Sequence, residues 1–548
     1  MKTICKSLFS SCLFGLVAIV IAMPALAQSA AEPAIVVSIS SIKEQIKDVS
    51  YLMEASGFGQ MKFLAKSQMK HFTRGISADA PGGVLMYFEG DDPMPRIVGF
   101  LPVENLDDFL DTISGFMEVD DSEDDIIVSG PDGQELVVRE SGENIFISNS
   151  ADSLKDLPED PQSMLGELPT KYNMAAHIFG NRVPDELRKK AIDMIKDGYA
   201  DQLRNMGEEV AEVQIENFEK QIALLEDIDE LKIGMLADKD AQKLAMEFEM
   251  KVAPGSKMAE SYAMFGAVEP TRFGGFMSDA AALDYNTCFG IKPEDTEQYT
   301  SSIDTAIDAV MTELENDGEL TDDEVDTVRG AVTELAEVLG ETFQSGRIDS
   351  GGQIMMEGTE VNLVAGAEIA NPQKVENAAK DLIELAQSKA GDKISVNLNS
   401  GSYKGVNLHE VVIHVPEDEE ELQDFIGSEI KILLGIGKKD VYLAAGTSPL
   451  DRLKAAMDSK STEPPEFPIV YNVRITPILE FFANTTGQPM LDELTAKMKE
   501  IGRDKITIYS KAIENGMFTR AEMDDGPLGL IQTAVMNFQQ QFAEPADF

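Results

Sequence analysis

The sequence contains few of the residues that most often build disulfides, metal centres and nucleic-acid interfaces. Its 548 residues include three cysteines, four histidines, and 46 lysines and arginines against 97 aspartates and glutamates. The formal net charge of −51 opposes binding to a phosphate backbone, so nucleic acid is excluded as an expected partner. Cys5 and Cys12 lie in an expected leader, which leaves Cys288 alone in the rest of the chain and excludes an internal disulfide there.

The first 27 residues have the pattern of a secretory signal peptide. Lys2 and Lys6 precede a mostly apolar stretch, and Ala25-Leu26-Ala27 forms an A-x-A cleavage site. No later run approaches the ~18 apolar residues of a membrane span. We therefore expect an exported, periplasmic or extracellular chain that has no transmembrane segment once residues 1–27 are removed.

The order of predicted elements repeats along the chain. Gly82-Gly83 and Gly351-Gly352 each follow a predicted strand and two predicted helices, and each precedes two strands and a helix. A P-x-x-Y-N phrase also recurs, beginning at Pro169 and at Pro468. The pattern predicts an α+β fold of two related halves that arose by internal duplication, each a mostly antiparallel sheet with helices packed on it. A single irregular α+β protein with chance repeats is the alternative.

The predicted halves span residues 28–272 and 273–548, and the first carries an extra long helical region at 184–229. Apolar residues recur at helical spacing between 199 and 225. Two interpretations of this stretch stay open: a longer helix that covers the sheet, or a surface for self-association.

Two phrases carry a resemblance to known sequences. The first is Gly99-Phe100-Leu101-Pro102-Val103, which leads into a helix from Leu106; the second is Ala253-Pro254-Gly255-Ser256-Lys257-Met258, followed by Arg272-Phe273-Gly274-Gly275. The chain resembles uncharacterised exported proteins of planctomycete-type bacteria over most of its length. The resemblance implies export and an aquatic bacterial source, and it implies no activity.

Motifs for catalysis are weak. His409 and His414 have nearly the spacing of a zinc-protease motif, but they lie on a predicted strand, where positions five apart face opposite sides. Ser350 sits in a protease-like Asp-Ser-Gly-Gly phrase, but the matching turn before Gly82 has no serine. No G-x-S-x-G, G-x-G-x-x-G or P-loop motif occurs. No catalytic or cofactor-binding residue is therefore predicted.

Residues 313–324 have the spacing of an EF-hand calcium loop. The candidate ligands are Glu313, Glu315, Asp317 and Glu324, with glycine at the sixth position. Positions 1 and 3 are glutamates where the tight loop prefers the shorter aspartate, so a helical hairpin with a capping box at Thr321–Glu324 is the favoured interpretation. Calcium is a weak candidate, and no other metal or cofactor is expected.

One basic stripe interrupts the acidic sequence. Lys62, Lys66, Lys70 and Arg74 recur every four residues, and no aspartate or glutamate occurs between Glu54 and Asp79. Like charges at this spacing repel, so something anionic should compensate them. The first hypothesis is a contact with carboxylates of the protein itself, across the junction of the halves, where the predicted helix 321–343 carries opposite charge. The second is an external anionic ligand, such as a polysaccharide, a lipid headgroup or another envelope component.

These observations favour an acidic exported protein that acts by binding or by interaction with the cell envelope, and that is not an enzyme. Two alternatives remain open: a hydrolase that uses a carboxylate pair, or a carrier that holds an apolar ligand in a cavity between sheet and helices.

Overall fold

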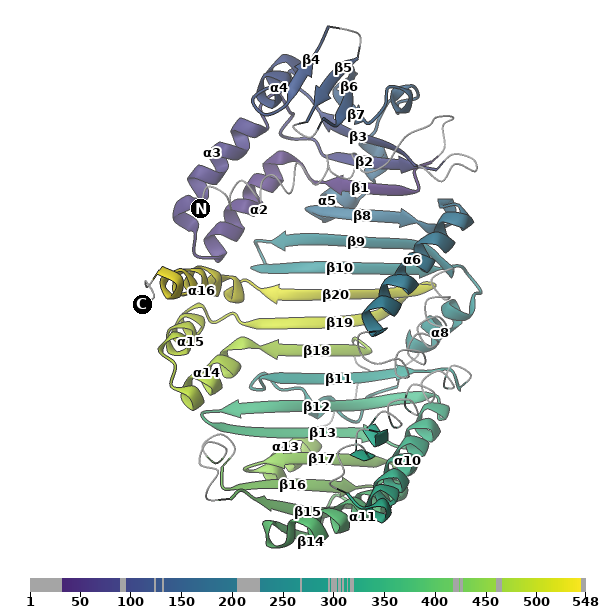
Figure 1. The fold of residues 1–548 in the computed structure, drawn as a ribbon, viewed down its shortest axis with the longest axis vertical. Coiled ribbons are helices and arrows are strands. Elements are labelled where there is room, and N and C mark those ends of the chain that lie inside the picture. The colour runs from purple at the N-terminus through teal and green to yellow at the C-terminus, as the bar shows by residue number, and fades with distance from the viewer. Residues whose placement is uncertain are drawn as a thin grey trace. The chain divides into compact units, whose positions relative to one another are not determined.

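The computed structural model shows a mixed α+β protein (Figure 1). It describes residues 32–543 except 89–94, 123–124, 131–132, 205–226, 267–268, 417–422, 424–426, 460–465 and parts of 294–319. The expected signal peptide, most of the 199–225 face, Glu313 and Asp317 fall outside the described residues or side chains. The α+β class and the antiparallel strand pairing agree with the prediction.

The chain divides into two compact units. Unit 1 contains residues up to 192, residues 226–253 and residues from 520 onward; unit 2 contains residues 193–225 and 254–519. The predicted division lay between residues 272 and 273 and placed the C-terminal segment in the second half. In the structure, residues from 520 onward belong to unit 1 instead.

Unit 1 has ten antiparallel strands in the pairing order β4-β5-β6-β7-β3-β2-β1-β8-β9-β10. Their bounds are β1 Ile35–Ile39, β2 Gly82–Tyr87, β3 Arg96–Pro102, β4 Glu118–Asp120, β5 Ile126–Ser129, β6 Glu135–Ser141, β7 Asn144–Ser148, β8 Met174–Phe179, β9 Ile228–Asp238 and β10 Lys243–Val252.

The helices of unit 1 pack on both sides of this sheet. One core cluster lies under α4 and includes Phe109 and Val84; a second includes Phe100 and Phe146 with the short helical turns that precede β8. The helices are α2 Ile42–Ala55, α3 Lys62–Phe72, α4 Leu106–Ile113, α5 Leu168–Lys171 and α16 Gly526–Ala543, with α6 Asp185–Arg204 shared between the units.

Unit 2 repeats this pairing order. Its strands pair as β14-β15-β16-β17-β13-β12-β11-β18-β19, which is the unit 1 order from β4 to β9 with ten added to each number. Their bounds are β11 Leu283–Gly290, β12 Arg347–Glu357, β13 Glu360–Glu368, β14 Ile394–Tyr403, β15 Val406–His414, β16 Glu429–Ile436, β17 Asp440–Gly446, β18 Ile469–Arg474 and β19 Lys505–Ile513; β20 Gly516–Asp524 contributes residues to both units.

The two sequence repeats differ in their structural positions. Both Gly-Gly pairs lie on the second strand of their unit and face the first strand: Gly83 lies opposite Ser38, and Gly352 lies opposite Tyr285. The P-x-x-Y-N phrases do not match in this way, because Asn173 precedes β8, whereas Asn472 lies inside β18 opposite Asp284. The Gly-Gly repeat is therefore the structurally equivalent one.

The predicted helix boundaries of unit 2 agree closely with the structure. α10 spans Asp322–Gln344 and begins with a reciprocal capping box between Thr321 and Glu324. α11 spans Pro372–Ala390, and a proline occupies its first position, where the missing backbone N–H has no helical partner to lose. The remaining helices are α8 Lys257–Gly266, α13 Pro449–Asp458, α14 Ile475–Thr486 and α15 Pro489–Ile501, and the turn η6 Gly274–Phe276 packs with α13 over one face of the sheet.

Asp48 of α2 gives unit 1 a pH-dependent contact. Its half-buried carboxylate accepts a hydrogen bond from Nδ2 of Asn173, just before β8. Burial, with a smaller contribution from Glu44, raises the pKa of Asp48 to about 6. The neutral carboxyl stabilises the fold fully below pH ~4, and this contribution is lost as the pH rises through 6.

We therefore expect Asp48→Asn to stabilise unit 1 at alkaline pH. At pH 8 the free energy of unfolding should rise on the order of 1 kcal/mol over the parent, because the substitution removes a partly buried charge. At pH 4 parent and variant should be equal, since both side chains are then neutral. Urea denaturation at both pH values measures the difference, and an equal gain at pH 4 would contradict the assignment.

Candidate functional site: an exposed apolar sheet face

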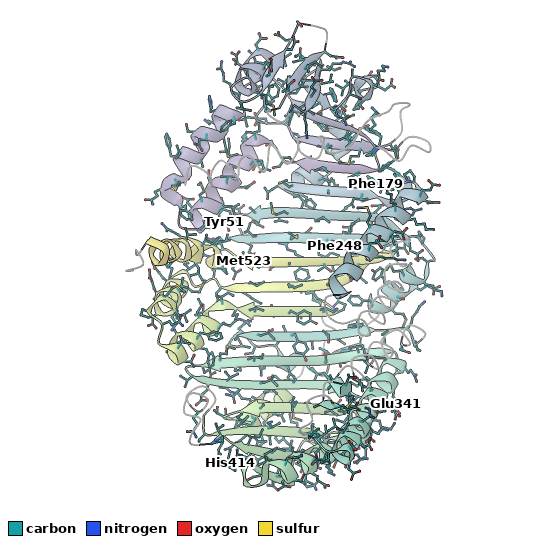
Figure 2. All side chains as sticks on the ribbon, viewed as in Figure 1. Tyr51, Phe179, Phe248, Glu341, His414 and Met523 are labelled. Carbon is teal, nitrogen blue, oxygen red and sulfur yellow. The ribbon has the colours of Figure 1, made fainter. Side chains whose placement is uncertain are left out.

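Three adjacent rows of side chains on β1, β8, β9 and β10 form one apolar surface. Residues directly opposite on antiparallel strands share a face, and every second residue continues that face. The register places twelve apolar residues on it, hereafter the methionine face (Phe248 is labelled in Figure 2): Ile39, Met174, Met235 and Met246; Val37, Ala176, Ile233 and Phe248; Ile35, Ile178, Leu231 and Met250.

Part of the methionine face is open to solvent, whereas Met250 at its edge is 8% exposed and Val37 packs against the core of unit 1. Met246 is 55% exposed, Met235 is 44% exposed and Ile233 is 38% exposed. An antiparallel sheet with one wet side normally turns its polar residues to water. A contiguous apolar surface left exposed is therefore a candidate interaction site rather than an ordinary scatter of surface methionines.

The opposite side of the same strands carries the charges. Glu247 is 4% exposed, and its carboxylate contacts Oη of Tyr172 at 2.7 Å, Nζ of Lys171 at 2.6 Å and a guanidinium nitrogen of Arg520 at 2.8 Å. Burial alone would raise the pKa of Glu247, but the hydrogen bonds from Lys171 and Tyr172 bring it below its usual value. The sheet is thus inverted at this point: Glu247 is buried and paired, while Ile233, Met235 and Met246 on the other side face outward.

Gly234 allows this buried arrangement. It lies on β9 between the exposed Ile233 and Met235, and a Cβ at its position would lie 2.3 Å from the ring of Tyr172. The missing side chain lets Tyr172 cross β9 and reach Glu247.

Unit 2 shows the same inversion. Tyr285, Tyr471 and Ile508 lie opposite one another on β11, β18 and β19, and the two tyrosine rings stack with centroids 5.9 Å apart. Tyr471 is 41% exposed and Ile508 is 43% exposed. On the other side of the same strands, Asp284 and Asn472 are almost fully buried. We call the row Tyr285–Tyr471–Ile508 the tyrosine row.

Two buried carboxylates of unit 2 are held by hydrogen bonds from neighbouring side chains. Asp284 accepts hydrogen bonds from Asn472 at 2.6 Å and from Arg474 at 2.7 Å. Asp349 accepts from Thr271 at 2.6 Å and from Arg347 at 2.9 Å. Carboxylates saturated in this way hold the fold in register and have little capacity left for proton transfer.

Cys288 and Ser350 do not have the surroundings of nucleophiles. Cys288 is fully buried, and burial, reinforced by Asp349, raises the pKa of its thiol to about 12. The thiol therefore stays protonated and unreactive at neutral pH. Oγ of Ser350 lies 2.7 Å from Oγ1 of Thr287 and is not paired with a histidine in the described structure.

His409 and His414 contact neighbouring side chains and lie on opposite sides of one strand. Both lie on β15, as predicted, and His409 is 2% exposed, with its ring 3.4 Å from the carboxylate of Glu376 on α11. His414 instead contacts Ser395 and Glu429. Across the described part of the chain, no group of three histidine, cysteine or acidic side chains is placed to hold a metal ion.

The described part of the candidate calcium loop is engaged elsewhere. The carboxylate of Glu324 accepts from the backbone N–H of Thr321 at 2.7 Å and from Lys389 of α11 at 2.8 Å. These contacts, led by Lys389, lower the pKa of Glu324 to about 2. Glu315 pairs with Arg329. Two of the four predicted ligands therefore serve the helical hairpin, and Glu313 and Asp317 lie outside the described residues.

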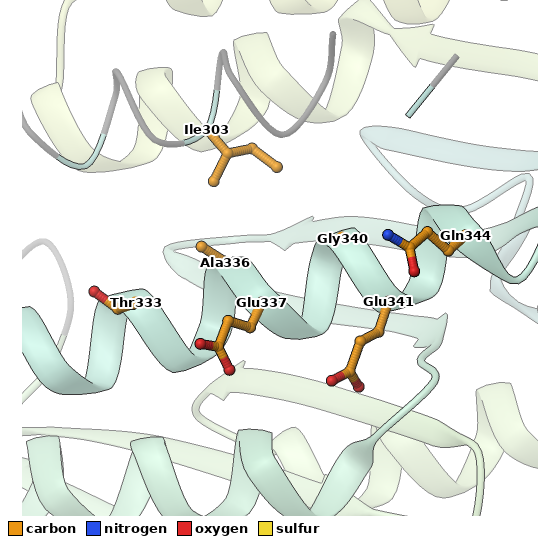
Figure 3. A pocket seen from close by; sticks show the side chains of 7 residues that line it. All are labelled: Ile303, Thr333, Ala336, Glu337, Gly340, Glu341 and Gln344. Carbon is orange, nitrogen blue, oxygen red and sulfur yellow. The ribbon is translucent and has the colours of Figure 1, made fainter. Parts of the chain in front are cut away.

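A groove along α10 is lined by both polar and apolar side chains, and none of its lining residues comes from a strand. Its volume is about 320 Å³, and Thr333, Ala336, Glu337, Gly340, Glu341 and Gln344 line it together with Ile303 (Figure 3). Lys374 of α11 already pairs with Glu337 and Glu341 at 2.9 and 3.0 Å. The groove therefore does not match the apolar cavity between sheet and helices that the carrier alternative requires.

The basic stripe on α3 only partly meets the first hypothesis. Lys62 pairs with Glu54 of α2, and Arg74 pairs with Asp108 of α4, so both contacts lie within unit 1 and not at the predicted junction. The acidic side chains of α10 that were expected to face the stripe instead pair with Lys374 and Lys389 of α11. Among the described residues, Lys66 and Lys70 have no carboxylate within 4.0 Å and are exposed.

The sequence analysis identified the stripe but missed both sheet faces. Alternation along β9 and β10 is visible in the sequence and shows which residues share a side of the sheet. Which side is covered depends on packing of α5 and of the turns before β8, and no local pattern reveals that packing. Leu64 belongs to the apolar residues of α3 and is nevertheless 52% exposed.

Comparison with protein-family models, curated proteins and solved structures gives no match to this chain. The resemblance to exported planctomycete-type proteins therefore stays a prediction. Among the described residues, no helix is both long enough and apolar enough to cross a bilayer.

Proposed function

We propose that this chain is a non-enzymatic binding protein of the cell exterior that holds an apolar or amphiphilic small molecule against the methionine face. The observation that carries the proposal is the inverted sheet, in which Met235 and Met246 are far more exposed than the paired Glu247 behind them. Methionine suits this role because its flexible, polarisable side chain adapts to ligands of different shape.

The size of the methionine face favours a small ligand over a protein. Four strands about 4.8 Å apart and three rows about 6.8 Å apart cover roughly 14 by 14 Å. A stable protein interface buries about 800 Å² on each partner, several times this area. An acyl chain or a comparable apolar molecule fits the available surface.

The tyrosine row supports an internal duplication, which we propose as the origin of the two units. The shared pairing order and the equivalent Gly-Gly positions support it, and so does the recurrence of buried polar groups behind an exposed apolar row. In place of a cavity between sheet and helices, the proposed site is an open face.

The binding proposal is tested by replacing Met235 and Met246 with glutamine. Glutamine keeps the length of the side chain but cannot contribute apolar contact, so the affinity for an uncharged fluorescent probe such as N-phenyl-1-naphthylamine should fall roughly tenfold. The fold should be unaffected because both side chains are exposed. Fluorescence titration measures the change.

The matched control is Met490→Gln, which alters a methionine on α15 that is 38% exposed. Its affinity should equal that of the parent. Unchanged binding in the Met235→Gln/Met246→Gln variant, or an equal loss in the control, would refute the site.

A further inference from the structure

The exposed side of α3 combines cations with large apolar side chains. Phe63 is 81% exposed and Leu64 is 52% exposed, whereas Met69 on the opposite side is buried. At 100° per residue, Phe63 lies about 20° from Lys70 and about 60° from Lys66 around α3, which ends at Phe72 before Arg74. The aromatic ring therefore projects beside Lys70, at one edge of the basic stripe.

Two of the four cations are available for an external partner. Within the described residues, Lys66 and Lys70 lie outside ion-pair distance of any carboxylate. Lys62 and Arg74 have exposed partners, and exposed pairs contribute only about 0–1 kcal/mol, so anionic groups of a ligand can replace them. The segment contains no acidic residue from 55 to 78, in a chain with 97 of them.

We propose that α3 docks unit 1 onto the surface of an anionic phospholipid bilayer. The lysines and Arg74 contact phosphate groups, and Phe63 and Leu64 enter the boundary between headgroups and acyl chains. An interfacial helix needs both an apolar element and flanking cations, and α3 exposes Phe63 next to Lys70, with Leu64 on the adjoining side. A sulfated or carboxylated polysaccharide would use the cations but would leave Phe63 without a role. The inference does not depend on ligand binding at the methionine face.

Sedimentation of the purified protein with vesicles tests the docking. At about 0.15 M salt, screening limits the repulsion between the chain's net charge of −51 and the vesicle to about 8 Å. Under these conditions the protein should bind vesicles of mixed phosphatidylcholine and phosphatidylglycerol, and should not bind phosphatidylcholine alone. Lys66→Ser/Lys70→Ser should weaken the partition about 30-fold, since each lysine near an anionic surface contributes about a factor of five. Phe63→Ser should weaken it on the order of tenfold through lost apolar insertion.

Matched controls separate this effect from general loss of charge or apolar surface. Lys438→Ser/Lys439→Ser removes two adjacent exposed lysines of unit 2, and Phe482→Ser removes a phenylalanine on α14 that is 41% exposed. Both should bind as the parent does. Circular dichroism and the melting temperature should be the same for all variants, because every replaced side chain is partly or fully exposed.

Three results would overturn the docking. One is absence of binding to the anionic vesicles. Another is retention on dextran sulfate that depends on Lys66 and Lys70 but not on Phe63, which would assign the stripe to a polysaccharide. The third is a salt-sensitive dimer, seen by analytical ultracentrifugation and lost in the lysine variant, which would assign it to a second copy of the chain.

Discussion

Asp284→Ala is expected to destabilise unit 2 by about 3–5 kcal/mol. The carboxylate lies fully buried on β11 and contacts Arg474 at 2.7 Å and Asn472 at 2.6 Å. Its removal leaves the guanidinium of Arg474, whose side chain is 8% exposed, without the buried charge that compensates it. The cost of an unpaired buried charge exceeds that of any lost surface contact. Urea denaturation of parent and variant gives the difference.

Arg474 itself supplies the control. It also contacts Asp279 at 3.0 Å, but the side chain of Asp279 is fully solvent-exposed. Asp279→Ala removes an ion pair from the same guanidinium at a surface position, so the loss should stay below about 1 kcal/mol. If Asp284→Ala and Asp279→Ala lowered the free energy of unfolding by similar amounts, burial of Asp284 would not determine how much it stabilises unit 2.

Gly275→Ala should have the second large effect. Gly275 lies in the turn η6 against the end of α13, where a Cβ would stand 1.8 Å from the carbonyl oxygen of Ser459 and 2.4 Å from that of Ala456. Both are backbone atoms, so the clash cannot be relieved by a side-chain rotation. The flanking Phe273 and Phe276 are buried in the core of unit 2, and shifting η6 would open that core. We expect a loss of about 3 kcal/mol in the free energy of unfolding.

Gly330→Ala is the matched control for this prediction. Gly330 lies inside α10, and a Cβ there would meet no atom within 4 Å. Alanine in an open helical position should stabilise the protein by about 0.5–1 kcal/mol. The two substitutions add the same methyl group, so opposite signs in denaturation experiments are expected; a neutral Gly275→Ala would contradict the packing described here.

Buried polar networks also account for carboxylates in the strands that belong to no catalytic motif in the sequence. Asp349 and Glu247 stand in strands among apolar residues, where an isolated carboxylate would suggest chemistry. Their partners Thr271 and Tyr172 lie 78 and 75 positions away along the chain. No local pattern in the sequence connects such pairs. The hydrogen bonds that satisfy each carboxylate are formed only when the strands pair in register.

Local signals in the sequence were sufficient for the elements that depend on neighbouring residues. Two helix starts could be predicted because each depends on residues no more than three positions apart. They are the capping box of Thr321 and Glu324 at α10 and the first-turn proline Pro372 at α11. Alternation placed both histidines on β15, and spacing aligned Lys62, Lys66, Lys70 and Arg74 on one helix.

Tertiary structure decided which surfaces are covered. Alternation assigns Met235 and Met246 to one side of their strands and Glu247 to the other, but the hydrophobic pattern alone would bury the methionines. Tyr172, Lys171 and Arg520 reverse that expectation by compensating Glu247 inside the protein. Likewise, Leu64 is exposed because α2 and α4 contact α3 on another side. The periodicity of a sequence determines which residues share a side of a strand or helix. Burial depends on long-range packing, so the assembled fold determines which of those sides is exposed to water.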